Sequence, residues 1–220
     1  MEAIEVAVQS RGRGRPRKDQ SQPDAPRARL LRQGVTILTE KGFSAVGIDE
    51  ILATAGVPKG SFYHYFDSKE DFGLALLDYY DQHFLRKLDR WFLDEGMSPL
   101  DRFRAFIADA REIMERFEFR RSCLVGHLGQ EMGVLPESFR HRLIKVLEGW
   151  EERTAGCFRA AQQAGEVPVN IDCEKMARFF WIGWEGAVLR ARLECDPVAL
   201  DVFSEGFLEM LTMESVERKK

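Results

Sequence analysis

Hydrophobic residues recur along most of this 220-residue chain at intervals of three or four positions, the spacing of one face of an α-helix. Pro, Gly, Ser and Asp interrupt this pattern, and no alternation of polar and apolar residues is long enough for a β-strand. The pattern therefore predicts an all-α fold. The expected helices cover residues 25–41, 48–54, 58–65, 68–93, 122–132, 136–164, 172–195 and 197–214, with one more that begins at 98–99.

The stretch IDEILATAGVPKGSFYHYF has the pattern of two short helices joined by a sharp turn. Gly56 tolerates the positive φ that such a turn needs. Phe62 and Phe66 are four residues apart, so we expect both to face inward and to hold the second helix on its partners. A unit of this kind places its second helix in the major groove of DNA. The stretch therefore predicts a helix-turn-helix unit.

The remaining side chains of the second short helix are polar at their tips. Tyr63, His64 and Tyr65 cannot all face inward, and their polar atoms suit phosphate oxygens. Lys59 and Ser61 lie at its exposed start, where they are placed for base edges or phosphates. These five residues are the expected contacts of this helix with DNA.

Charge is distributed unevenly along the chain, although its formal net charge is only −4. Residues 11–70 carry 11 Lys and Arg against 7 Asp and Glu, whereas residues 71–220 carry 21 against 27. A basic end on an acidic body suggests a partner that meets one end only. The run RGRGRPRKDQSQPDAP predicts a flexible basic arm that follows phosphates or enters a minor groove; a solubilising tail is the alternative. The arginines expected to contact DNA are Arg13, Arg15 and Arg17.

The cysteines and the hydropathy of the chain bear on its location. The four Cys residues have neither CxxC nor Cys/His spacing, so no metal site is expected. The first ten residues lack the basic region and the long apolar run of a signal peptide, and no stretch of 18 apolar residues occurs. We therefore expect a cytoplasmic protein with reduced thiols and no contact with a membrane.

The segment GFSAVGIDEILATAGVPKGSFYHYFDSKEDFGLALL resembles the DNA-binding signature of the TetR family of bacterial repressors. The turn and the Lys-Gly, Tyr and Phe-x-x-Lys-Glu elements all occur at the spacing of that family. The resemblance implies an all-helical homodimer that binds a double-stranded DNA operator. It implies a basic arm at residues 1–24, a three-helix DNA-binding domain at 25–70, and a ligand-binding and dimerisation domain at 71–220.

The resemblance also implies roles for individual residues. Lys59, Gly60, Tyr63 and His64 would lie on the recognition helix. Lys69 would contact a phosphate at the start of the following helix. The family usually has Thr or Ser just before the second helix. Here the residue is glycine, at position 47, which removes one hydroxyl contact.

The segment RRSCLVGHLGQEMG is similar to one in a branch of the family that senses electrophiles and small unsaturated compounds. Within that branch, the whole chain resembles the acrylate-responsive repressors of dimethylsulfoniopropionate catabolism. This implies acrylate as the small-molecule inducer; the alternatives are other electrophiles or oxidants that act through Cys123, or an efflux substrate. Arg120, Arg121 or His127 could make that thiol reactive by lowering its pKa. The alternative is a buried, inert thiol that only packs, in a protein that binds its ligand reversibly.

We expect the ligand domain to enclose an aromatic pocket between helices four to eight of the chain. Each of its residues has packing in the core as an alternative role, because aromatic residues at helical spacing usually pack. The expected ligand-binding residues are Cys123, His127, Gln130, Trp150, Trp181 and Trp184. The last two helices are expected to form the dimer interface, since small residues in the eighth let another helix approach closely.

The sequence contains no motif that predicts catalysis. Glu131 lies four residues after His127 on one helix face, but no second His completes a zinc-binding HExxH motif. P-loop, GxSxG and GxGxxG motifs are absent as well. We expect a hydrogen-bonded His–Glu pair, no enzyme and no cofactor. A structural protein that coats DNA is a rival reading, although coating would not require a large acidic, aromatic-rich body.

Overall fold

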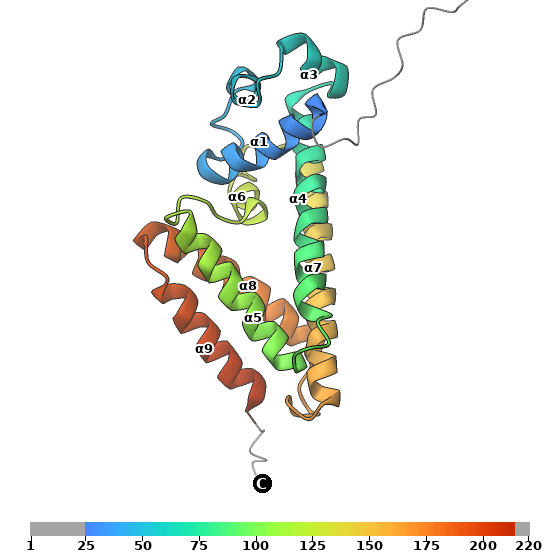
Figure 1. Ribbon diagram of the computed structural model, residues 1–220, viewed down its shortest axis with the longest axis vertical. Coiled ribbons are helices and arrows are strands. Elements are labelled where there is room, and N and C mark those ends of the chain that lie inside the picture. The colour runs from blue at the N-terminus through green and yellow to red at the C-terminus, as the bar shows by residue number, and fades with distance from the viewer. Residues whose placement is uncertain (1–24, 214–220) are drawn as a thin grey trace, which may run out of the picture.

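The computed structural model describes residues 25–213, and the secondary structure of this part of the chain is entirely helical (Figure 1). The predicted basic arm and its Arg13, Arg15 and Arg17 lie outside the described residues. The helices are α1 (Pro26–Lys41), α2 (Ile48–Ala55), α3 (Lys59–Tyr65), α4 (Lys69–Phe92), α5 (Pro99–Arg116), α6 (Leu124–Gln130), α7 (Glu137–Gln163), α8 (Cys173–Glu194) and α9 (Val198–Thr212). The all-α prediction is confirmed, and the helix ends that it gave lie within two residues of those observed.

Local signals in the sequence account for several helix ends. The side chains of Ser68, Ser98 and Asp172 each accept a hydrogen bond from a backbone N–H in the first turn of the helix that follows. Gly47 begins α2 without a side-chain cap. Gly56 ends α2 in the left-handed conformation, at φ 61°, which glycine adopts without strain. The sharp turn between α2 and α3 therefore follows from that one residue.

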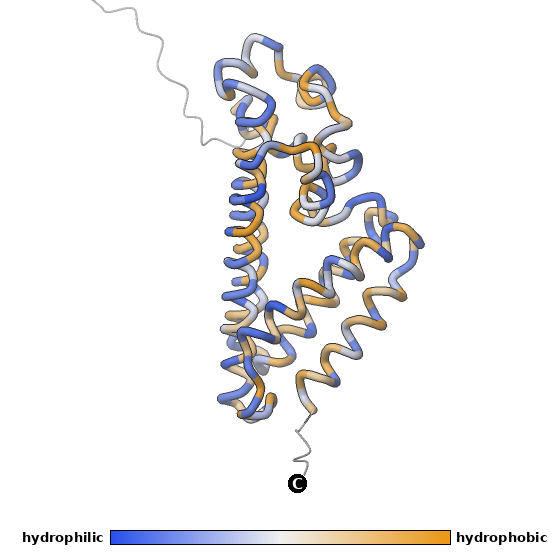
Figure 2. Tube along the Cα trace, turned by 180° about the vertical axis from the view of Figure 1, so that it is seen from behind, coloured by the Kyte–Doolittle hydropathy of each residue, from blue (hydrophilic) through white to orange (hydrophobic). Residues whose placement is uncertain are grey.

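Helices α1, α2 and α3 form a small unit at one end of the molecule, and the long helix α4 leads from it into the body (Figure 1). Helix α4 runs beside α7, while α5, α8 and α9 form the other side of the body. The predicted domain boundary at residue 70 falls within the first turn of α4. Helix α4 thus belongs to both parts of the fold. Figure 2 shows that hydrophobic and hydrophilic residues alternate around the helices, as amphipathic packing requires.

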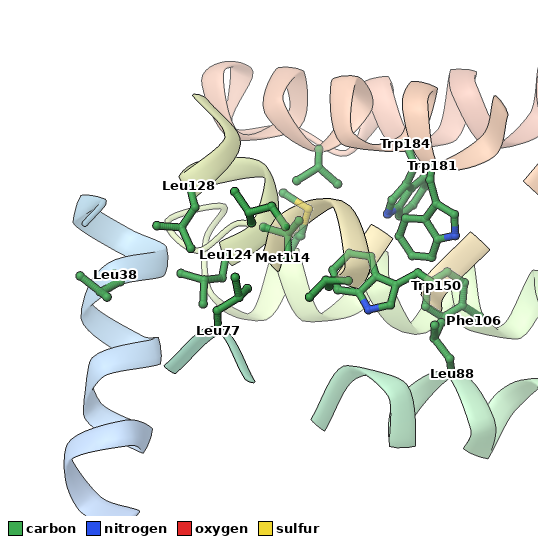
Figure 3. Close-up of a cluster of buried hydrophobic side chains, with 14 of the residues drawn as sticks. Leu38, Leu77, Leu88, Phe106, Met114, Leu124, Leu128, Trp150, Trp181 and Trp184 are labelled. Atoms are coloured by element: carbon green, nitrogen blue, oxygen red, sulfur yellow. The ribbon is translucent and has the colours of Figure 1, made fainter. Parts of the chain in front are cut away.

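The buried side chains form one hydrophobic cluster that extends from the small unit into the body. Leu38 of α1 belongs to the same cluster as Leu77 of α4 and Leu124 of α6 (Figure 3). Gly34 lets α1 approach α4 closely, because a Cβ at this position would collide with Leu76 and Phe72. The two parts of the fold are therefore packed against each other rather than linked by a free hinge.

Candidate DNA-binding and ligand-binding sites

The recognition helix α3 is anchored by aromatic residues on its inner face. Phe62 is completely buried, and its ring centroid lies 5.4 Å from that of Phe66 and 5.5 Å from that of Phe72. This packing agrees with the inward orientation expected from the four-residue spacing. It fixes the orientation of a helix that is only seven residues long.

The opposite face of α3 is open to solvent. Tyr63 is 53% exposed, and Lys59, Gly60 and His64 are exposed as well. Ser61 and Tyr65 are half-buried, and the Tyr65 ring packs against the core. Lys59 Nζ lies 2.8 Å from an exposed carboxylate on α2, that of Asp49. The structure therefore brings most of the predicted DNA-contacting side chains of α3 together on one accessible surface.

Lys69 has a different environment from the one we expected. Its Nζ donates a hydrogen bond of 2.7 Å to the Phe43 carbonyl and lies 4.5 Å from the centroid of the Phe43 ring. Partial burial lowers the pKa of this amine. In this structure the ammonium that was expected to reach a phosphate instead holds the turn between α1 and α2 against α4.

A cavity of about 310 Å³ lies between α1, α4, α5 and α8. Of the six predicted ligand residues, Cys123, Trp181 and Trp184 line it. Both Trp side chains point from α8 into the interior, toward the side where Trp150 and Phe106 lie (Figure 3). The sequence reading missed the polar and charged groups of the wall. These are Thr36, Thr39, Tyr80, Lys87, Arg121, Ser122 and Glu185.

A smaller cavity of about 210 Å³ adjoins the first, with Ser122, Cys123, Glu185 and Val188 common to both walls. The predicted residues His127 and Gln130 line this second cavity, together with Arg192. The predicted ligand residues are thus divided between two neighbouring spaces.

Trp150 lines neither of these two cavities. It is completely buried, and its indole N–H donates a hydrogen bond of 3.0 Å to Asp81. Its ring centroid is 5.0 Å from that of Trp181. The observed role of Trp150 is therefore packing behind the cavity wall, which was the alternative reading of the aromatic spacing.

Of the two alternatives for the Cys123 thiol, the structure favours the unreactive one. Burial raises its pKa well above the usual range, and the nearby carboxyl of Glu185 raises it further. Arg120 and Arg121, which could have lowered it, pair instead with Glu118 and Glu40. The environment of Cys123 favours the neutral thiol, which is a weak nucleophile.

The expected His127–Glu131 pair is also wrong, because the two residues bind different partners. The ring nitrogens of His127 lie 3.0 and 3.2 Å from a guanidinium nitrogen of Arg192. Burial and this cation lower the pKa of His127. Glu131 accepts hydrogen bonds of 2.8 and 2.7 Å from the backbone N–H groups of Phe43 and Ser44.

Arg192 connects the smaller cavity to the end of α1. It donates hydrogen bonds to the backbone carbonyls of Thr39, at 3.3 Å, and Glu40, at 2.6 Å. A cation at a helix C-terminus satisfies carbonyls that have no partner in the helix and interacts favourably with the helix dipole. Arg121 adds an ion pair of 2.8 Å with the Glu40 side chain. Residues of the cavity walls therefore touch the DNA-binding unit directly.

The outer faces of α8 and α9 form an apolar groove of about 590 Å³. Among the small residues of α8, Gly183 and Ala191 serve the chain's own packing: a Cβ on Gly183 would collide with Phe203 of α9, and Ala191 is fully buried. Ala187 lines the groove. Several large apolar side chains that line the groove are exposed. These are Phe179, Val198, Val202 and Met210.

Neither a metal site nor a membrane-spanning helix is found within residues 25–213. No cluster of three or more His, Cys, Asp or Glu side chains is placed to hold a metal ion in this range. None of the helices described is long and apolar enough to cross a membrane.

Comparison with known proteins gives matches to both parts of the chain. Residues 30–76 match the family model "Bacterial regulatory proteins, tetR family", and residues 99–207 match "Tetracyclin repressor-like, C-terminal domain". The chain is 56% identical over 197 residues to the transcriptional regulator AcuR of Cereibacter sphaeroides, covering 89% of each chain. It is 33% identical over 167 residues to the transcriptional repressor NemR of Escherichia coli, covering 76% of this chain and 84% of that one.

Solved structures agree with these matches. The crystal structure of a regulatory protein TetR from Rhodobacter sphaeroides has a TM-score of 0.80 at 56% identity, over 82% of this chain and 96% of that chain. The reduced form of E. coli NemR has a TM-score of 0.76 at 25% identity, over 87% and 98% of the two chains.

Proposed function

Because this chain belongs to the TetR family of transcriptional regulators and is not an enzyme, we propose that it is a ligand-released repressor that acts in the cytoplasm. As a homodimer it binds a pseudo-palindromic operator through α3, and it leaves the operator when a small inducer occupies the cavity of the body. A two-fold dimer presents two recognition helices, which must lie about 34 Å apart, one turn of DNA, to read both half-sites.

The dimer is proposed to form through the apolar groove of α8 and α9. A contiguous exposed apolar surface of this kind is characteristic of a protein–protein interface. The groove contains Val202, which is 66% exposed in the single chain. Packing of the same two helices of a second chain against this groove would remove that apolar surface from water.

The observation that carries the proposal is the contact between the cavity walls and the end of α1. Arg192 and Arg121 line the two cavities and bind the last turn of α1. Helix α4 provides a second route, since its 24 residues span about 36 Å from the DNA-binding unit to the far end of the body. A ligand shifts the dimer toward a form whose two recognition helices no longer match the DNA. It does so only if its affinity for that form exceeds its affinity for the DNA-binding form.

Acrylate is the inducer that we propose. The cavity of about 310 Å³ is large enough for a three-carbon unsaturated acid, and its wall combines apolar side chains with hydrogen-bonding groups. The identity to AcuR and the Cys-Leu-x-Gly segment that begins at Cys123 also favour a ligand of this class. The alternative is a response to other electrophiles or oxidants at Cys123, which lines both cavities, or release by an efflux substrate.

Fluorescence anisotropy of a labelled operator, obtained by selection from random DNA, tests the proposal. We expect acrylate to release the protein from this duplex, whereas propionate at the same concentration measures the effect of a saturated acid. Intact mass spectrometry of the released protein then separates the mechanisms: a stable adduct at Cys123 would favour the thiol. If acrylate at millimolar concentration releases nothing while N-ethylmaleimide does, the acrylate assignment fails.

A further inference from the structure

Glu185 is a carboxyl group inside the body that has no ionic partner in the described part of the chain. It lies on α8 and contributes to the walls of both cavities. Its Oε1 atom is buried and accepts no hydrogen bond from any residue between 25 and 213. Its other oxygen is packed against Gly126 of α6, where a Cβ would collide with it. The absence of a side chain at Gly126 thus makes room for this carboxyl group.

The groups that face Glu185 do not neutralise it. Tyr80 of α4 and Cys123 at the start of α6 interact with the carboxyl group, and both are uncharged because burial raises their pKa values. From α5 and α1 the cavity wall receives only apolar side chains and the hydroxyls of Thr36 and Thr39. Neither of these can supply a positive charge.

The cations that line the two cavities are engaged elsewhere. Lys87 Nζ lies 2.7 Å from the carboxylate of Asp109, and Arg121 lies 2.8 Å from that of Glu40. Arg192 binds the α1 carbonyls and the ring of His127, whose own pKa is lowered. A carboxylate that enters the larger cavity therefore meets no free cation among the described residues, and it meets the unpaired oxygen of Glu185.

Two like charges cannot share a buried site without a proton between them. A protonated carboxyl group donates one O–H hydrogen bond, and a carboxylate is a strong acceptor for it. We propose that Glu185 is the residue that holds the inducer's carboxylate, through one proton shared between the two carboxyl groups, so that the occupied cavity contains a monocarboxylate and a single proton. This inference rests on the proposed function, and it makes Glu185 a specificity-determining residue of the ligand site.

The proposal predicts a pH dependence of definite sign. Burial raises the pKa of Glu185 to about 7, whereas a simple carboxylic acid is ionised above about pH 5. Below pH 7 the Glu185 proton is in place and the affinity is constant. Above pH 7 it must be taken up from solvent, so the affinity falls by about tenfold for each pH unit. An organic cation would show the reverse, because it needs ionised Glu185.

Isothermal titration of acrylate into the full-length protein at pH 6 and pH 8 tests the inference. We expect the wild-type affinity to be about tenfold weaker at pH 8 than at pH 6. Glu185→Gln keeps an N–H donor but cannot ionise, so it should bind acrylate at pH 8 about as tightly as the wild type does at pH 6. Glu185→Ala should bind weakly at both pH values. Circular dichroism establishes that the variants are folded.

A pair of glycine variants tests the same geometry without touching Glu185. Gly126→Ala should push the carboxyl group from its position and weaken acrylate binding severalfold. Gly129→Ala lies on the same helix with open space around its Cβ, and it should bind as the wild type does. Equal affinities for these two variants would overturn the assigned position of the carboxyl group.

The outcomes separate this inference from the proposed function. Acrylate that binds with equal affinity at both pH values, or a Glu185→Gln variant that keeps the wild-type pH dependence, overturns the shared proton while the repressor assignment stands. Propylammonium that binds more tightly at pH 8 than at pH 6, and is lost in Glu185→Gln, overturns it in favour of a cation site. Wild-type protein that binds no acrylate at any pH overturns both this inference and the assignment of acrylate as the inducer.

Discussion

The recognition helix and the inner cavity are built in opposite ways. Helix α3 buries one aromatic face and presents polar tips to solvent, so its chemistry is on the outside and each group is hydrated until DNA replaces the water. The cavity places Tyr80, Cys123 and Glu185 among aromatic rings, where burial shifts the pKa of each group. An exposed surface gains binding energy from complementary charge, whereas a buried site can also select the protonation state of its ligand.

The difference between the two regions makes their connection informative. Few polar contacts join them, chiefly those of Arg192, Arg121 and Glu131 with the end of α1 and the turn after it. A change on the exposed surface should therefore leave the cavity intact, and a change in the cavity should leave α3 folded. Only a change in the dimer interface, or in the contacts of Arg192, Arg121 and Glu131 with the end of α1 and the turn after it, should affect both regions.

The largest effect is expected from Val202→Glu, which should leave α3 and the cavity of each chain intact and prevent only the association with the second subunit. Burying an unpaired carboxylate in an apolar interface costs several kcal/mol, so the variant should be monomeric by light scattering at micromolar concentration. A monomer carries one recognition helix, and operator affinity should fall by about 100-fold or more. Val169→Glu, at an exposed position outside the groove, is the control. A dimeric Val202→Glu would place the interface elsewhere.

A smaller effect is expected from Tyr63→Ala, which alters the exposed surface alone. A hydrogen bond to a charged group contributes about 1.5–3 kcal/mol, so operator affinity should fall by about tenfold or more. Because phosphate contacts carry no sequence information, the affinity of Tyr63→Ala for unrelated duplexes should fall in parallel with its affinity for the operator. Lys59→Ala should instead change the DNA sequence that the protein prefers. Gel shift measures both. Binding of the operator at wild-type strength would remove Tyr63 from the interface.

The smallest of these effects is expected from Arg192→Met, which removes the hydrogen bonds between Arg192 and the carbonyls at the end of α1. Operator binding and acrylate binding should each persist, but the factor by which acrylate weakens operator binding should decrease severalfold, corresponding to about 0.5–2 kcal/mol of coupling. Arg178→Met is the matched control, since Arg178 lies on the same helix, is exposed, and lines neither the two cavities nor the groove. If acrylate weakens operator binding by the wild-type factor in both variants, the coupling passes through α4 instead.

The exposed region was predictable from sequence because its determinants are local. The turn at Gly56, the anchors Phe62 and Phe66, and the polar tips between them all lie within eleven residues. Helical periodicity alone decides which of these side chains face inward. The exception is Lys69, whose amine binds the Phe43 carbonyl, a contact across 26 positions that no local pattern indicates.

The cavity was only partly predictable because its wall is assembled from residues between Val35 and Val188. Aromatic spacing identified Trp181 and Trp184 but could not separate them from Trp150, which packs behind the wall. Glu185 was missed, although a single acid within the apolar run FWIGWEGAVL was a signal for it. The sequence left a reactive and an inert Cys123 thiol open, because sequence neighbours such as Arg120 and Arg121 need not be spatial neighbours, and only the fold shows the burial that raises its pKa.

The central claim is that an inducer in the cavity and an operator on α3 exclude each other, and reciprocal binding tests this most directly. Acrylate is titrated into free protein and into protein saturated with operator, and the operator is titrated with and without saturating acrylate. One ratio compares the acrylate affinities of free and operator-bound protein, and the other compares the operator affinities without and with acrylate. Thermodynamic linkage requires that these two ratios be equal. We predict that each ligand weakens the binding of the other by at least about tenfold, corresponding to about 1.4 kcal/mol of coupling. Equal acrylate affinities for free and operator-bound protein would contradict the account.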